Sequence, residues 1–360
     1  MILANTTNEH GGVLRRVALS RARHYSDECA FILPNNDFRA TAFGAKQQST
    51  SSAFLIHNNF RLRILGSTAL IQINSSSKDS KRCCFHIAFV CMKSYDTAWA
   101  TTLIKQYLAP DGYVVSLQNC MNEETIAGIV GWGKTLGCIA SSILVNLPEP
   151  GHIHRGAGKG GVGHTVFRAG EVHGRITQRA EEICRLVGYA DSSKVTSNLW
   201  GERWSKLVAN AMGNGLSACT GLSGGLMLQS EPIRRFSTRL GSEAIRVGQA
   251  HGYQLEEILH LPPETIARAG EGDEAAMRAC DEQRFKDGKH TSSEQRPSMG
   301  QDMQKGRRTE IEFLNGFVVR EGEKIGLSCS ANAVLTDIVK RVERNELSPD
   351  PRHITELRLN

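Results

Sequence analysis

Three polar side chains recur at four-residue intervals in the second half of the chain, at Lys206, Asn210 and Asn214. On an α-helix a step of four residues advances about 40° beyond a full turn, so these side chains form one polar stripe. Asparagine has a low helix propensity and is a poor choice for a helix face that meets only water. The spacing therefore predicts a helix whose polar stripe contacts a ligand, with a solvated helix face as the alternative.

A second informative tract runs from 298 to 320. Its apolar residues recur at helical spacing on one side, and Glu310 lies off that side, close to Arg307 and Arg308. Taken alone, Glu310 is typical of a surface carboxylate. Its position by itself therefore assigns it no role.

The glycine-rich segment 158–163 fits G-x-G-x-x-G, the turn that holds a dinucleotide pyrophosphate. That turn follows a first strand and opens a helix. Here a proline-rich segment, 148–151, precedes the glycines, and the β-like segment 164–167 follows them. We therefore expect a flexible glycine turn that does not bind the dinucleotide.

Alternating strands and helices surround further polar residues. Apolar runs at 85–92, 113–117 and 138–145 predict strands, and helices are expected to begin at Asp96 and at Glu123. This order predicts a Rossmann-like doubly wound parallel sheet, in which ligands lie beyond the carboxyl ends of the strands. Lys93 and Asn119 follow the first two strands and are expected at that edge.

From about Asn198 long helical tracts replace the alternation. The expected parts are an atypical, partly disordered N-terminal segment at 1–84, a Rossmann-like domain at 85–197 whose first βαβ unit is atypical, an all-α helical domain at 198–345, and a polar tail at 346–360. The polar runs 47–52 and 75–80 favour loop or disorder in the first part.

The composition narrows the classes of protein. No tract approaches the roughly 18 consecutive apolar residues of a membrane helix, and an anionic substrate or cofactor accounts for the net charge of +6 without nucleic acid. The ten cysteines form no C-x-x-C pair, which predicts free thiols in a cytoplasmic protein and no metal site. An arginine-rich start leaves organelle import as an alternative.

Five segments in order make the chain resemble the ketopantoate reductase (2-dehydropantoate 2-reductase) family over roughly 85–345. The family's W-x-K-L-x-x-N-A-x-x-N pattern is matched at 204–214, with small residues after it at 216–221, and its Ser-Met pair and R-x-T-E-I-x-x-x-N-G pattern are matched at 298–299 and 307–316. Lys93 matches a lysine after an apolar strand, and 117–119 matches L-Q-N, with Cys120 in place of the family's glycine. The family's initial strand, G-x-G-x-x-G turn and helix have no counterpart in 1–80, although 54–63 resembles the following segment.

The resemblance implies NADPH-dependent reduction of 2-dehydropantoate to pantoate, on the route to pantothenate and coenzyme A, with NADP as cofactor bound by the domain at 85–197. It also implies a helical substrate-binding domain of the 6-phosphogluconate dehydrogenase C-terminal-like kind. A lysine ammonium beside the carbonyl supplies a proton and a positive charge where negative charge develops. The implied site residues are Lys206 and Glu310 as the catalytic pair, Asn210, Asn214, Ser298 and Asn119 for the substrate, and Lys93 and Asn119 for the cofactor.

One geometric condition follows. A straight helix of twelve residues spans about 18 Å, so Ser298 and Glu310 can serve one small substrate only if the chain bends between them or the helix begins after Ser298.

Two alternatives stay open: a reductase of another 2-keto acid, and an inactive pseudoenzyme that lacks a working cofactor turn. In each active case the expected partner is a small-molecule 2-keto acid, with no nucleic acid and no membrane, and a homo-oligomer is compatible with the sequence.

Overall fold

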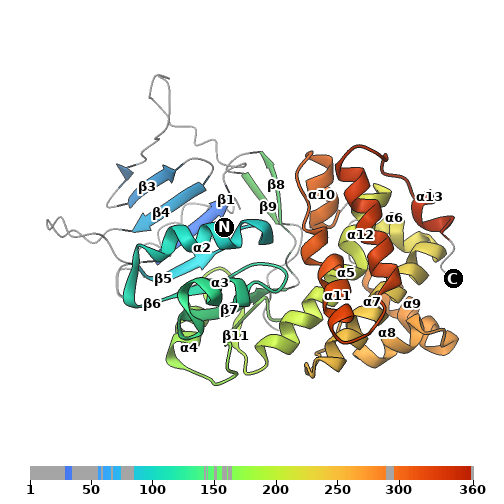
Figure 1. Cartoon of the computed structure of the whole chain (residues 1–360), viewed down its shortest axis with the longest axis horizontal. Helices are drawn as coiled ribbons and strands as arrows, with labels where there is room; N and C mark the ends of the chain where they lie inside the picture. Colours follow the sequence, from blue (N-terminus) through green and yellow to red (C-terminus); the bar gives the residue numbers. More distant parts are fainter. Residues whose placement is uncertain are drawn as a thin grey trace, which may run out of the picture. The chain divides into compact units, whose positions relative to one another are not determined.

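The computed structural model describes residues 29–34, 56–57, 60–65, 68–73, 85–141, 143, 145–149, 152–155, 160, 164–288 and 296–357, and before residue 85 it describes the backbone alone. Contacts divide the chain into two compact units, Met1–Leu199 and Trp200–Asn360. Each unit is described by itself below. Figure 1 labels their helices and strands.

Within its described residues, the first unit holds a mixed sheet of nine strands in the order β11-β10-β7-β6-β5-β1-β4-β3-β2. Strands β1, β5, β6 and β7 are parallel neighbours, β10 is antiparallel to β7, and β4 pairs antiparallel with β1 and β3. The bounds are β1 Cys29–Pro34, β2 Ile56–His57, β3 Phe60–Leu65, β4 Thr68–Ile73, β5 Phe85–Val90, β6 Leu108–Ser116, β7 Thr135–Ala140, β10 Phe167–Glu171 and β11 Ser193–Val195. Strands β8 (Val145–Glu149) and β9 (His152–Arg155) form a separate antiparallel pair. The parallel strands β1, β5, β6 and β7 at the centre of this sheet, followed by the helices of the second unit, confirm the predicted fold class.

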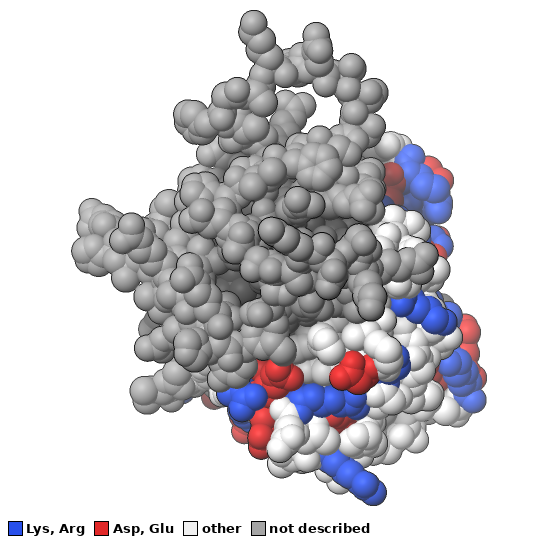
Figure 2. Space-filling view, turned by 90° about the vertical axis from the view of Figure 1, so that its left-hand side faces the viewer, with Lys and Arg blue, Asp and Glu red and all other residues white. Residues whose placement is uncertain are grey.

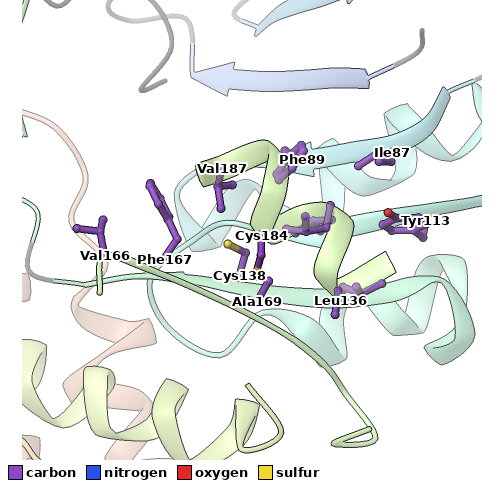
Figure 3. Packing of buried hydrophobic residues seen from close by; sticks show 13 residues of the cluster. Ile87, Phe89, Tyr113, Leu136, Cys138, Val166, Phe167, Ala169, Cys184 and Val187 are labelled. Carbon is purple, nitrogen blue, oxygen red and sulfur yellow. The ribbon is translucent and has the colours of Figure 1, made fainter. Parts of the chain in front are cut away.

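Strand β5 shows why this sheet has helices on both faces. Ile87 and Phe89 belong to the cluster that α4 (Gln178–Gly188) covers, seen in Figure 3. Ala88 and Val90 pack against α2 (Thr97–Lys105) and α3 (Glu123–Val130). Because successive side chains of a strand point to opposite faces, a continuous apolar run marks a strand buried on both sides.

Several strand boundaries differ from the sequence-based expectation. Strand β6 begins at Leu108 and not at 113, because the turn residues 110–112 form an irregularity inside it: Phe85 pairs with Leu108, but Ile87 already pairs with Tyr113. The expected strand at 138–145 is divided between β7, which ends at Ala140, and β8. Strands also occur at 29–34, 60–65 and 68–73, within the N-terminal segment that we expected to be atypical and partly disordered. The polar runs 47–52 and 75–80 lie outside the described residues.

The second unit consists of helices packed on one another (Figure 1). They are α5 Leu199–Thr220, α6 Gly224–Gln229, α7 Glu231–Ala250, α8 Pro263–Gly270, α9 Glu274–Gly288, α10 Ser298–Gln304, α11 Asn315–Lys324, α12 Ser330–Glu343 and α13 Arg352–Thr355, with a 3-10 turn, η5, at Ile311–Phe313. Among the described helices, none is long and apolar enough to cross a bilayer.

Charged side chains of both signs are interspersed on the described surface seen in Figure 2. Within the helical unit, Arg246 bonds Glu264 and Glu271, and Arg235 bonds Glu231 and Glu274. Pairing of this kind neutralises the cations locally.

Candidate active site

Helix α5 carries the predicted polar stripe. Lys206 and Asn210 are half-buried and Asn214 is 8% exposed, whereas Leu207, Val208 and Ala211 are at most 1% exposed. The helix therefore buries an apolar side and keeps Lys206 and Asn210 within reach of solvent. The stripe is a real feature of the helix surface.

Trp204 fixes the rotation of α5 about its axis. Its indole is fully buried, donates from Nε1 to the carbonyl of Ala244 at 2.9 Å, and contacts the rings of His251, Tyr253 and Phe317. Gly248 on α7 makes room for it, since a Cβ there would lie 2.3 Å from the indole nitrogen. Anchoring the opposite side of the helix in this way holds the polar stripe in one orientation.

The structure brings Ser298 to the stripe. Ser298 opens α10, and its Oγ accepts a hydrogen bond from Asn214 Nδ2 at 3.4 Å. Two residues later α10 approaches α5 closely, because a Cβ on Gly300 would lie 2.3 Å from Ser217 Oγ. Two residues assigned to the substrate, 84 positions apart in the sequence, are therefore neighbours.

The condition that the chain bends between Ser298 and Glu310 is met. Helix α10 ends at Gln304, Gly306 adopts a φ of +60° that favours glycine, and η5 starts only at Ile311. The single tract 298–320 is thus two helices with a turn between them.

Glu310 lies where this second segment meets α5. It is 5% exposed, and its carbonyl accepts from the amides of Phe313 and Leu314 at 2.9 and 3.0 Å. The next side chain, Ile311, packs on α5: a Cβ on Gly215 would lie 3.0 Å from Ile311 Cδ1. The buried position differs from the surface carboxylate that the sequence alone suggested.

Two other titratable residues of the helical unit, Glu312 and Cys219, have structural surroundings. Lys340 Nζ bonds Glu312 Oε1 at 2.8 Å, and this hydrogen bond, together with the charges of Lys340 and Arg308, lowers the pKa of Glu312. Burial raises the pKa of the Cys219 thiol, near the end of α5, to about 12. Glu312 is therefore a structural ion-pair partner and Cys219 an inert neutral thiol.

In the sheet unit, Lys93 and Asn119 lie just after β5 and β6, the strand ends where we expected them. Gln118, 5% exposed, donates from Nε2 to Met92 O and to Thr97 Oγ1, both at 2.8 Å. Asn122, 2% exposed, donates to Asn119 O at 2.7 Å and to Ser94 Oγ at 3.2 Å. These buried amides tie the two strand ends together and hold the backbone beside Lys93 and Asn119.

Gln118 and Asn122 were not among the predicted site residues. The available signal was their type: Gln118 follows β6 and Asn122 precedes α3, and amides at such positions are either ligand contacts or braces. Spacing could not distinguish these roles, since the hydrogen bonds to Met92, Thr97 and Ser94 join residues more than 20 positions apart.

Cys120, which follows Asn119, has a φ of +65°. This is the left-handed region that favours glycine, and a residue with a Cβ costs roughly 1–2 kcal/mol there. The family's L-Q-N-G pattern has glycine at this position. The substitution to cysteine therefore leaves the turn in place with added strain.

Of the glycine segment 158–163, Gly160 alone lies within the described residues. Its N–H donates to Asp191 Oδ1 at 2.9 Å, and Asp191 also pairs with Arg155. Burial by itself would raise the pKa of Asp191, but bonds from the Ser192 amide and Arg155 outweigh it and lower that pKa. The Gly160 amide therefore donates to a carboxylate within the protein. That the segment 158–163 does not bind the dinucleotide stays a prediction.

The family profile described as ketopantoate reductase PanE/ApbA matches residues 45–166, and the profile of its C-terminal part matches 198–343. The 2-dehydropantoate 2-reductase of Archaeoglobus fulgidus is 29% identical over 260 residues, covering 71% of this chain and 76% of that protein.

Solved structures agree on the fold. The 2-dehydropantoate 2-reductase of Geobacter metallireducens is similar with a TM-score of 0.63 at 22% identity, over 94% of this chain and 98% of the other. A PanE/ApbA family ketopantoate reductase from Ralstonia eutropha gives 0.57 at 25% identity, over 73% and 77%. D-mandelate dehydrogenase with NADH and anilino(oxo)acetate gives 0.59 at 19% identity, over 75% and 79%.

Proposed function

The chain belongs to the ketopantoate reductase PanE/ApbA family, and on this premise we propose that it catalyses the NADPH-dependent reduction of 2-dehydropantoate to pantoate. The observation that carries the proposal is a hydrogen bond between two helices: Asn214, on the helix α5 that also carries Lys206, donates to Ser298 on α10. It assembles, from distant parts of the sequence, polar groups suited to a small 2-keto acid.

The residues of the sheet unit fit a dinucleotide. Lys93 offers a cation for phosphate and Asn119 an amide for the nicotinamide or ribose, and both follow parallel strands at their carboxyl ends, where such ligands bind. Buried amides hold the backbone at this edge. When bound, the cofactor supplies the hydride.

Lys206 is the proton donor in this proposal. The carbonyl oxygen becomes an alkoxide as hydride arrives, and an ammonium beside it provides both charge stabilisation and a proton. Glu310 orients Lys206 or the substrate hydroxyl. Asn210 and Asn214 orient the substrate by hydrogen bonds, and Ser298 binds its carboxylate end.

A reductase of another 2-keto acid is the second candidate. The fold is shared with D-mandelate dehydrogenase, and the assigned residues address the keto and carboxylate groups that all such acids have in common. They leave the distal part of the substrate undefined.

The experiment is a steady-state assay of purified protein in which NADPH oxidation is followed with 2-dehydropantoate and with a series of other 2-keto acids, and repeated with NADH. We expect the highest kcat/KM for 2-dehydropantoate with NADPH. A higher kcat/KM for another acid favours the second candidate, and activity with none of them indicates the pseudoenzyme.

Oligomeric state accompanies this assay as a separate measurement. A dimeric ketopantoate reductase from Staphylococcus aureus shares the fold, with a TM-score of 0.54 at 16% identity. We propose a homo-oligomer here on that likeness, and light scattering at the assay concentration tests it.

A further inference from the structure

A chain of hydrogen bonds crosses the core of the helical unit. Asn315 donates from Nδ2 to the carbonyl of Ala211 at 3.0 Å and to Asn332 Oδ1 at 2.9 Å. Asn332 donates in turn to Leu240 O at 3.1 Å and to Glu243 Oε2 at 2.8 Å. Both asparagines are 0% exposed. The chain joins α5, α11, α12 and α7.

Its partners fix the orientation of both amides. Asn332 faces a carbonyl and a carboxylate, which only its NH₂ group can satisfy, so its oxygen must point to Asn315. Asn315 then faces two acceptors and must present its own NH₂ group. Glu243 also accepts from the backbone amides of Ala331 and Asn332, which anchors the far end of the network at the start of α12.

The network ends between candidate catalytic residues. Ala211 directly follows Asn210, within the stripe of Lys206, Asn210 and Asn214. Asn315 directly follows Leu314, whose amide donates to the carbonyl of Glu310. One side chain therefore connects the turn that carries Glu310 to the middle of the helix that carries Lys206.

Stability alone does not explain this choice of residue. Among the described residues, Asn315 Oδ1 is buried without a hydrogen-bond partner, which costs about 1–3 kcal/mol. An apolar side chain of similar shape, with a matching change at Asn332, would fill the space without that cost. An amide constrains distance and direction far more tightly than an apolar contact does.

We propose that Asn315 is a positioning residue for the reduction: it holds the Glu310 turn in register with α5, and Asn332 and Glu243 hold Asn315. The inference rests on the proposed function. Because Asn214 and Ser298 meet through other contacts, we expect a change in this register to affect KM less than kcat.

The test compares two variants that each lose a side-chain hydrogen bond to one of two neighbouring carbonyls of α5. Asn315→Ala removes the bond to Ala211 O and also the bond to Asn332 Oδ1. The matched control, Ser237→Ala, removes the 2.8 Å bond from Ser237 Oγ to Met212 O, which comes from α7. We expect Asn315→Ala to lower kcat about 10- to 100-fold with KM within about threefold, as misplacement near 1 Å does, and Ser237→Ala to keep kcat within about twofold.

A double-mutant cycle separates positioning from general destabilisation. If Asn315 acts through Glu310, Asn315→Ala added to Glu310→Gln lowers kcat little further, because coupled residues are not additive. Full additivity, or equal kcat effects of the Asn315 and Ser237 variants, would overturn the inference. Asn332→Ala serves as a second variant if Asn315→Ala does not fold, with the same expected result.

Hydrogen exchange keeps the inference separate from the proposed function. We expect Asn315→Ala to speed exchange at the amides of Phe313 and Leu314 relative to Ser237→Ala, whichever acid is the substrate. An inactive wild-type protein contradicts the proposed function, and unchanged exchange contradicts the positioning role.

Discussion

The strained turn at Cys120 predicts that glycine is more stable than alanine at this position, which is the reverse of the usual order. At an ordinary buried position glycine is less stable than alanine by about 0.5–1 kcal/mol, because it loses more backbone freedom on folding. With a φ of +65°, alanine at position 120 keeps the left-handed penalty of roughly 1–2 kcal/mol and glycine does not. Both variants lose the same buried sulfur, so that loss cancels between them.

Subtracting the central values of the two ranges leaves Cys120→Gly more stable than Cys120→Ala by roughly 0.75 kcal/mol. Urea unfolding of both variants measures the difference. Cys138 provides the control: it is fully buried in β7, where Cys138→Ala should be the more stable of the pair. An alanine variant at position 120 that is as stable as the glycine variant, or more so, would refute the strain argument.

Two further predictions concern the sheet unit. Replacing Gly160 and Gly161 by alanine should lower the stability of the protein, since a Cβ on Gly160 would lie 2.2 Å from Ser192 Oγ. The affinity for NADPH, measured by calorimetry, should nevertheless stay within about tenfold of the wild-type value. Complete loss of NADPH binding in a folded variant would show that this segment holds the dinucleotide. Burial by itself would raise the pKa of Glu171, but hydrogen bonds from Arg179 and Thr177 and the Arg179 charge outweigh it, so the pKa is lowered. The stabilising effect is therefore complete above the usual carboxylate pKa of about 4.3 and is lost as the pH falls through the lowered value. Wild-type unfolding free energy should fall more steeply between pH 5 and acid than that of Glu171→Gln, and equal slopes would contradict the assignment.

Local sequence patterns predicted those parts of the fold that local patterns determine. The apolar run at 85–90 specified a doubly buried strand, and the four-residue spacing at Lys206 specified a helix with a polar stripe. Strand β6 was misjudged because Pro110 and Gly112 are ordinary turn residues, and only pairing with Phe85 on β5 keeps them inside a strand.

The residue types of the candidate site could be predicted from the sequence, but the hydrogen bonds and packing that hold these residues in place could not. Matching motifs identified Asn214 and Ser298, and the structure places them in contact. The bracing roles of Gln118 and Asn332 were not predicted, because their hydrogen-bond partners lie 17 to 92 positions away in the sequence and local spacing carries no information on such contacts. The buried state of Glu310 was missed for the same reason, since it depends on how α5 and the segment after α10 pack.

We propose that Lys206 donates the proton to the carbonyl oxygen as it is reduced, and the turnover of Lys206→Ala with 2-dehydropantoate and NADPH tests this role. The control is Lys324→Ala, an exposed lysine of the same unit that pairs with Glu321. We predict that kcat falls by a factor on the order of 100 or more in Lys206→Ala and stays at the wild-type value in Lys324→Ala. A folded Lys206→Ala protein with near wild-type kcat would show that another group donates the proton.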